Sequence, residues 1–146
     1  MGATLSSAKA FEDVAVGEAL PGKTVHIDRA RLVQYAGASL DRNPIHWDER
    51  FAVSVGLPDV IAHGMFTMGA AITVVTEWLG DAGRVVRYST RFTKPVVVPY
   101  DTGADVVFTG TVSALDPQTR QATVELGANC GSDKVLGRAT AVVQLR

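Results

Sequence analysis

The apolar residues of this chain fall into one long apolar segment and several alternating segments. The long segment, Val60 to Val75, contains His63 as its one ionisable residue. Large apolar side chains recur along it at intervals of three and four: Ile61, Met65, Met68, Ile72, Val75 and Leu79. This spacing predicts a helix that begins near Ala62. Because Ala and Gly fill much of its opposite face, we expect it to be buried on most sides.

The second half of the chain has the pattern of strands. Four segments rich in Val, Thr and aromatic residues are separated by short turn sequences: 84–92, 104–115, 121–130 and 134–145. Apolar and polar residues alternate cleanly in 121–130, as expected when one face of a sheet is buried. The pattern predicts an antiparallel meander.

Nearer the N-terminus, the pattern predicts one further strand and two short helices. Residues 23–27 have the composition of a strand. Asp28 is suited to cap a helix that stops around Gly37, and Asp48 to cap another that ends near Gly56. Several antiparallel strands and one apolar helix indicate an α+β fold in which the sheet curls around that helix.

Length and composition limit the class of protein. The chain has 146 residues, the size of one ordinary domain, so we assign residues 1–146 to a single domain. The formal net charge is −1 and the basic and acidic residues are interspersed, which argues against a nucleic-acid partner. The lone Cys130 cannot form an internal disulfide, and we expect it to be a structural thiol in a reducing compartment.

Two features of the sequence bear on cellular location. Residues 1–20 show no basic region followed by an apolar one, so we expect no secretory signal. The segment 60–75 is interrupted by Thr, Gly and His and is shorter than the roughly 20 apolar residues that a bilayer requires, so we expect no membrane insertion. We therefore predict a cytoplasmic protein.

Candidate chemistry is concentrated in SLDRNPIHWDERF, residues 39–51. Pro44 disfavours helix at Asn43, so the segment is predicted to be a turn. A turn can bring Asp41 and His46 to one point, where a carboxylate beside an imidazole suits proton transfer coupled to the addition or loss of water. The alternative is that Asp41 and Asn43 only stabilise the turn and His46 only begins the next helix.

A second candidate element is His63-Gly64, near the predicted helix start. The N–H groups of a first helical turn lack acceptors within the helix, so the Gly64 amide can polarise a carbonyl oxygen that approaches it closely. His63 is either a further residue of the same substrate site or a partly buried structural histidine. The three histidines and Asp41 match no common zinc-ligand spacing, so we expect no metal.

Two motifs resemble those of a known family. Tyr35 to Ala52, YAGASLDRNPIHWDERFA, is similar to the signature of the MaoC-like (R)-specific enoyl hydratases and dehydratases. Ile61 to Met65, IAHGM, resembles the helix start that follows it in that family. The resemblance extends over nearly the whole chain and is closest to the catalytic B subunits of actinobacterial (3R)-hydroxyacyl-ACP dehydratases. It implies the hot-dog fold, a curled antiparallel sheet wrapped around a long helix.

The resemblance implies a reaction and the residues that perform it. The reaction is reversible hydration between trans-2-enoyl and (3R)-hydroxyacyl thioesters of CoA or acyl carrier protein, in fatty-acid or related acyl metabolism, without a cofactor. Asp41 and His46 would form the catalytic pair. Asn43 would fix substrate or water, and the Gly64 amide would bind the thioester oxygen. Leu40 departs from the family, which usually has glycine there, and this bears on the geometry of the turn.

The resemblance also implies a second hot-dog unit. Exposed edge strands and the generous apolar content agree with pairing, as a homodimer or as a heterodimer with a related subunit. The acyl tail is expected along the long helix, near Met65, Phe66 and Met68. The alternatives to a hydratase are a hot-dog thioesterase, in which the pair directs water at the carbonyl carbon, and an acyl-binding subunit that needs a catalytic partner.

Overall fold

The computed structural model describes residues 8–146. Residues 1–7, which belong to the predicted domain and to the segment inspected for a secretory signal, lie outside the described part. The helices are α1 (Arg29–Ser39), α2 (Glu49–Ser54) and α3 (Gly64–Leu79), with short 3-10 turns η1 (Phe11–Asp13), η2 (Pro44–His46) and η3 (Ala82–Arg84). The strands are β1 (Ala19–Ile27), β2 (Val85–Phe92), β3 (Ala104–Asp116), β4 (Gln121–Cys130), β5 (Asp133–Lys134) and β6 (Leu136–Gln144).

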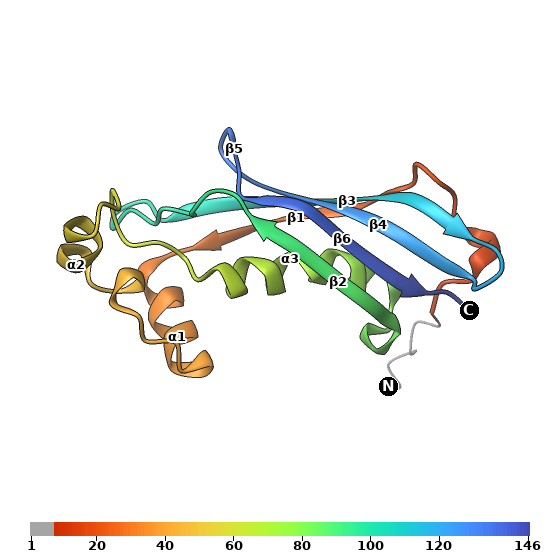
Figure 1. Ribbon diagram of the computed structural model, residues 1–146, viewed down its shortest axis with the longest axis horizontal. Coiled ribbons are helices and arrows are strands. Elements are labelled where there is room, and N and C mark those ends of the chain that lie inside the picture. The colour runs from red at the N-terminus through yellow and green to blue at the C-terminus, as the bar shows by residue number, and fades with distance from the viewer. Residues whose placement is uncertain (1–7) are drawn as a thin grey trace, which may run out of the picture.

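The strands form one antiparallel sheet that lies along one side of α3 (Figure 1). The strand order is β1-β3-β4-β6-β2, with β5 paired to β4, and the sheet is not closed. The helices α1 and α2 lie beyond one end of α3, at the left of Figure 1. This is the α+β arrangement of a curled sheet over an apolar helix that the sequence predicts.

The strand predictions are confirmed for β2, β3 and β4 and need correction at two other places. The segment 134–145 is not one strand, because it divides at Val135 into β5 and β6. β1 begins before the predicted 23–27, and its register with β3 shifts where Pro21-Gly22 interrupts it. Proline cannot donate to the ladder and glycine has no side chain to alternate, so the pattern concealed the first part of β1.

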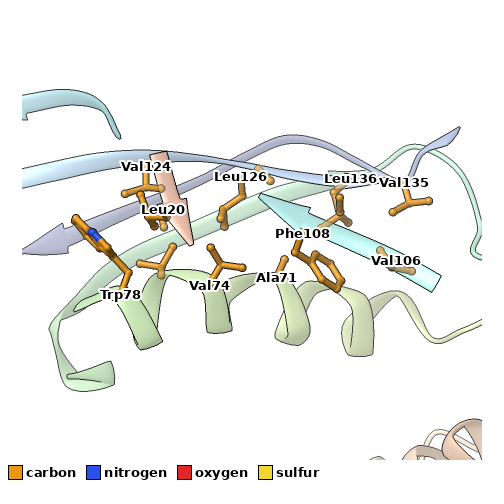
Figure 2. Close-up of a cluster of buried hydrophobic side chains, with 14 of the residues drawn as sticks. Leu20, Ala71, Val74, Trp78, Val106, Phe108, Val124, Leu126, Val135 and Leu136 are labelled. Atoms are coloured by element: carbon orange, nitrogen blue, oxygen red, sulfur yellow. The ribbon is translucent and has the colours of Figure 1, made fainter. Parts of the chain in front are cut away.

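The core lies between α3 and the inner face of the sheet (Figure 2). Buried and exposed side chains alternate along β3 and most of β4, as they do when one face of a sheet is covered. The labelled members of this cluster are Leu20, Ala71, Val74, Trp78, Val106, Phe108, Val124, Leu126, Val135 and Leu136. Because full burial of a Val, Leu or Phe side chain contributes about 1.5–3 kcal/mol, this layer is the main source of stability.

α3 is covered most fully on its sheet side, and three of its residues are exposed: Met65, Gly69 and Glu77. It begins at Gly64, with His63 as N-cap, rather than near Ala62. On its outer side Met65 is 61% exposed and Phe66 is half-buried. The prediction that this helix is buried on most sides therefore holds for most of its residues, and Met65 marks the side that is left open. Among the described residues no helix is long and apolar enough to cross a membrane.

The two short helices carry the predicted caps. The Asp28 carboxylate accepts a hydrogen bond from the Arg31 N–H at 2.8 Å, and the Asp48 carboxylate accepts one from the Phe51 N–H at 3.1 Å. Each cap satisfies one of the N–H groups that a helix start leaves without an acceptor. α1 continues through Ser39, past its predicted end.

Cys130 is half-buried at the end of β4. Burial raises the pKa of its thiol, and the Asp133 and Asp105 carboxylates raise it further. A thiol held in its protonated form is a poor nucleophile, which agrees with the expected structural role.

Candidate active site

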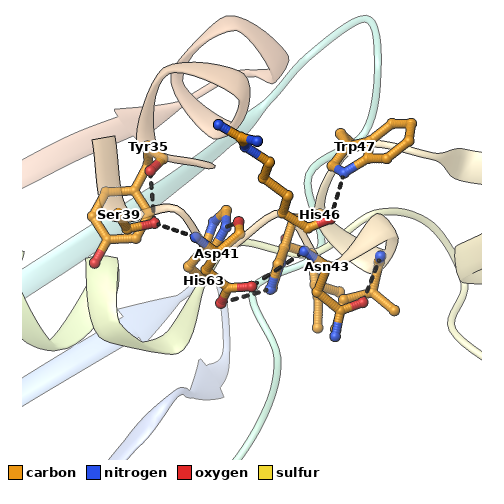
Figure 3. A network of polar contacts seen from close by, with 10 residues as sticks. Tyr35, Ser39, Asp41, Asn43, His46, Trp47 and His63 are labelled. Carbon is orange, nitrogen blue, oxygen red and sulfur yellow. Dashed lines mark hydrogen bonds and ion pairs between the residues drawn. The ribbon is translucent and has the colours of Figure 1, made fainter. Parts of the chain in front are cut away.

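A series of local hydrogen bonds holds the turn between α1 and η2 (Figure 3). Ser39 Oγ donates to the Tyr35 carbonyl at 2.8 Å and accepts from the Asp41 N–H at 3.2 Å. The Asp41 carboxylate in turn accepts from the Asn43 N–H at 3.2 Å. The segment is therefore a turn, as the sequence predicts, and its own backbone orients the Asp41 carboxylate.

Leu40 joins α1 to this turn in the left-handed region, with a φ of 64°. That conformation costs a residue with a side chain roughly 1–2 kcal/mol, whereas glycine adopts it freely. The Leu40 side chain is 71% exposed, so no core contact offsets the strain. The turn thus keeps the backbone geometry that a glycine would adopt, and Leu40 maintains it at a cost in stability.

Asn43 is used within the turn itself. Its Oδ1 accepts from the Ile45 N–H at 3.2 Å and so caps η2, whose first residue is Pro44. The Trp47 Nε1–H donates to the Arg42 carbonyl at 3.0 Å and fastens the same loop. Asn43 thus stabilises the turn through its Oδ1. A contact with substrate or water would use its Nδ2 donors.

Asp41 and His46 face each other across the turn. Asp41 Oδ2 and His46 Nε2 are 3.9 Å apart, too far for a direct hydrogen bond and close enough for both to contact one small molecule. The Asp41 side chain is 54% exposed, whereas His46 is only 6% exposed. The pair therefore combines a solvated carboxylate with a buried imidazole.

The surroundings of His46 set its protonation. Its Nδ1 lies 2.6 Å from the Ile61 carbonyl oxygen, and since a carbonyl only accepts, Nδ1 carries the proton and Nε2 presents a lone pair. Burial has the largest effect on the pKa of His46 and lowers it below the usual 6.5. The neighbouring His63 lowers this pKa too, while the hydrogen bond to Ile61 and the charge of Asp41 oppose the change. At neutral pH His46 is therefore an uncharged base.

His63 and Gly64 complete the site at the start of α3. His63 Nε2 donates to the Asp41 carbonyl at 3.0 Å, and its ring stacks on that of His46 with centroids 3.7 Å apart. Gly64 is the first residue of α3, so its N–H has no acceptor within the helix. A Cβ at Gly64 would lie 3.0 Å from the ring of Phe92, so glycine allows this close packing. The structure brings Asp41, His46, His63 and Gly64 together at the start of α3, and Asn43 lies in the adjoining turn.

His46 and Gly64 line an apolar cavity of about 380 Å³. Much of its remaining wall comes from the end of β2, the segment after it and the start of β6: Phe92, Thr93, Lys94, Pro95, Val96, Val135 and Leu136. The sequence did not mark these residues as a cavity wall, because a strand pattern carries no such signal. Met65, Phe66 and Met68, the expected path of an acyl tail, do not line it. Met65 and Phe66 instead line a groove on the outer side of α3.

The orientation of the rings argues against a metal centre here. Ligand atoms of Asp41, His46 and His63 lie within 4.8 Å of one another. A metal ion lies close to the plane of each imidazole that binds it, about 2.0–2.1 Å from the nitrogen. Because the two rings are stacked at 3.7 Å with 21° between their planes, one ion cannot satisfy both. His26 lies elsewhere, on β1, with its Nδ1 2.7 Å from Asp105.

Comparison with known proteins identifies relatives of this chain. Residues 12–129 match the family described as MaoC like domain. The 3-hydroxyacyl-thioester dehydratase X of Mycobacterium tuberculosis is 42% identical over 83 residues, which are 57% of this chain and 29% of that protein. The (R)-specific enoyl-CoA hydratase of Rhodospirillum rubrum is 32% identical over 139 residues, which are 93% of this chain and 92% of that protein.

A solved structure described as a MaoC-like dehydratase has the same fold. It is 45% identical to this chain, with a TM-score of 0.93. The match covers 96% of this chain and 43% of the solved one. The chain thus spans less than half of dehydratase X and of this structure, and nearly the whole of the R. rubrum hydratase. With the family match over residues 12–129 and this agreement in structure, the chain belongs to the MaoC-like dehydratase family and has its hot-dog fold.

Proposed function

We propose that this chain catalyses the reversible hydration of trans-2-enoyl thioesters to (3R)-hydroxyacyl thioesters. One observation carries the proposal: Asp41 Oδ2 lies 3.9 Å from Nε2 of His46, and His46 and Gly64 line one apolar cavity. A base, a carboxylate that orients water and a backbone donor for an oxyanion are the groups this addition needs. The names of the M. tuberculosis and R. rubrum relatives describe reactions of this class.

The Gly64 amide has the task of activating the substrate. The thioester oxygen accepts a hydrogen bond from its N–H, at the end of α3 where the helix dipole also favours negative charge. When water adds to C3 of the enoyl group, the charge moves onto this oxygen as an enolate. Because the donor is part of the helix backbone, it is held in place before the reaction begins.

His46 transfers the proton in this mechanism. Its neutral Nε2 takes a proton from water while the hydroxide bonds to C3, and it then gives that proton to C2, so that one water supplies both added groups. Delivery from a single imidazole places both groups on one face of the double bond, which is syn addition. The hydrogen bond to Ile61 and the nearby Asp41 carboxylate stabilise the transient imidazolium. Dehydration is the same path reversed.

Asp41 positions the water. One of its oxygens is held by the Asn43 N–H, and the other faces His46 Nε2 at 3.9 Å. A water that donates to both Oδ2 and Nε2 has a lone pair free to attack C3. Neither electrons nor a group other than water are exchanged, so the reaction needs no cofactor.

We also propose that residues 1–146 form one hot-dog unit that pairs with a second, identical or related unit. β1 and β2 are the two edges of the sheet, and Pro21 protects β1, whereas β2 contains no proline. Val86 of β2 and Met65 on the open side of α3 are exposed apolar residues. Two structures that share this fold, the ChsH1-ChsH2 complex and the truncated HadBC complex of M. tuberculosis, at 24% and 17% identity, are described as complexes.

We propose that the acyl group is carried as a thioester of CoA or of acyl carrier protein. Lys94 lines the cavity, and its Nζ lies 2.6 Å from the Asp133 carboxylate. In this proposal its charge meets a phosphate of the carrier.

The test is hydration of crotonyl-CoA and of a longer trans-2-enoyl-CoA, followed by the loss of enoyl absorbance and by chiral analysis of the product. His46→Asn keeps a donor for the Ile61 carbonyl and removes the Nε2 base, while His26→Asn makes the same change at an exposed histidine that does not line the cavity. We expect (3R)-product from the wild type and from His26→Asn, and a loss of about 10²–10⁴-fold in His46→Asn.

Two other outcomes would contradict the proposal. Release of free thiol without a hydroxyacyl product would make the chain a thioesterase. Binding of the enoyl thioester without turnover, until a hot-dog subunit with its own acid and histidine is added, would make it an acyl-binding subunit.

A further inference from the structure

His63 contacts both members of the proposed pair but does not line the cavity. It is 2% exposed and is absent from the residues that form the cavity wall, whereas its neighbours Ala62 and Gly64 belong to that wall. A side chain enclosed in this way cannot bind the substrate directly. Any part it takes in the reaction must act through the residues that it touches.

The hydrogen bonding of His63 defines one tautomer. Its Nε2 lies 3.0 Å from the Asp41 carbonyl oxygen, and because this oxygen only accepts, Nε2 carries the proton. Its Nδ1 is buried and has no hydrogen-bond partner among the residues that the structure describes. The ring therefore has its Nε2–H in use as a donor, while its Nδ1 is enclosed without a partner from the described residues.

The ring of His63 is packed on both sides. His46 stacks on it with 3.7 Å between centroids and 21° between planes. Tyr35 meets it edge-on, with centroids 4.8 Å apart and an angle of 63°. The ring therefore fixes the plane of the His46 imidazole against α1, while its N–H fixes the backbone that carries the Asp41 carboxylate.

We propose that His63 is a positioning residue that holds Asp41 and His46 in register, so that Oδ2 and Nε2 face the same water. The inference deepens the proposed function and rests on it. Histidine suits this place because it both stacks and donates. Phenylalanine could stack without donating, and glutamine could donate without a ring.

The kinetic experiment compares His63→Phe and His63→Gln with the wild type in the crotonyl-CoA assay. His26→Phe is the matched control, because it makes the same replacement at an exposed histidine on β1. We expect His63→Phe to lower kcat about tenfold to a hundredfold with little change in KM, since the substrate does not touch residue 63. His63→Gln should recover part of kcat by restoring the donor to the Asp41 carbonyl.

Three kinetic results would overturn the proposal. One is an unchanged kcat in a folded His63→Phe protein. Another is an equal loss in the Phe and Gln variants, which would show that the hydrogen bond contributes nothing. The third is a change confined to KM, which would place residue 63 in substrate binding.

A spectroscopic experiment on the wild type separates this inference from the proposed function. In ¹⁵N-histidine-labelled protein at neutral pH, we expect His63 to be protonated at Nε2 and bare at Nδ1, whether or not the protein hydrates crotonyl-CoA. An Nδ1–H tautomer, with no proton on Nε2, would overturn the positioning contact. A wild type that lacks hydratase activity while His63 has the expected tautomer would refute the proposed function and leave the contact to Asp41 standing.

Discussion

The core beneath the sheet and the turn at residues 39–47 are stabilised by different kinds of contact. In the core, side chains such as Phe108 and Val74 are fully enclosed by other apolar side chains, and their contacts have no direction. In the turn, one hydrogen bond leads to the next, from Tyr35 through Ser39 to Asp41 and Asn43. Volume therefore matters in the core, whereas the identity and orientation of single polar atoms matter in the turn.

This difference predicts that the two regions respond oppositely to substitution. A change in the core should lower the free energy of unfolding and leave the chemistry of the folded molecules intact. A change at the polar groups of the turn should remove activity with little effect on stability, because several of them are exposed. The four predictions that follow test this contrast.

The largest effect is expected from Asp41→Asn. The amide oxygen can still accept from the Asn43 N–H, so the turn should persist, but the charge that orients water beside His46 is lost. We expect kcat/KM for crotonyl-CoA to fall by about 10²–10⁴-fold and the thermal midpoint to move by only a few degrees. A large fall in thermal midpoint would show that the turn is part of the stabilising core, contrary to the contrast drawn here.

Phe108→Ala should give the reverse pattern. Phe108 is fully buried on β3, and removal of its ring leaves a cavity in the layer over α3. We expect the free energy of unfolding in urea to fall by about 3–5 kcal/mol, with kcat per folded molecule unchanged. Val107→Ala is the control, because Val107 is next to Phe108 on β3 and its side chain lies on the exposed face. A kcat that fell in proportion to stability would contradict the separation of the two regions.

The dependence on pH should reveal the burial of His46. Its pKa in the folded protein lies below the value of 6.5 that the unfolded chain has, so between the two values the unfolded state binds more protons. The effect of His46 on the free energy of unfolding is therefore most favourable above pH 6.5, and it becomes unfavourable as pH falls from 6.5 through the folded pKa. Because the base must be neutral, kcat/KM should stay high below pH 6.5 and then fall.

The measurements are urea unfolding and kcat/KM across this pH range, with His46→Asn as the control for stability. The slope of stability with pH should be smaller in His46→Asn than in the wild type. An acid limb of kcat/KM centred above pH 6.5 would contradict the lowered pKa.

The smallest effect is expected from Leu40→Gly. Leu40 has a φ of 64°, which is strained for leucine and not for glycine. We expect a gain of about 1 kcal/mol in the free energy of unfolding, with kcat unchanged. Leu40→Ala keeps the strained backbone and removes most of the exposed side chain, so it should not stabilise the protein. An equal gain in both variants would show that the side chain, and not the backbone, is responsible.

Much of the local structure could be predicted because short-range chemistry decides it. Asp28 and Asp48 cap their helices, since a carboxylate at that position meets the first free N–H groups. The alternation in 121–130 marks β4, and Pro44 marks the turn that carries Asp41. The motif around that turn, through its resemblance to a family, predicts Asp41 and His46 as the catalytic pair.

The tertiary structure decided which distant residues meet, and local patterns carry no information about that. The stacking of His63 on His46 and the bond from His63 to the Asp41 carbonyl depend on how α3 is docked beside the turn. The placement of Phe92 over Gly64 depends on the pairing of β2 with β6. Hydrophobic spacing shows that α3 has apolar faces, but only the packing of the sheet against it determines which face is covered and which is left exposed.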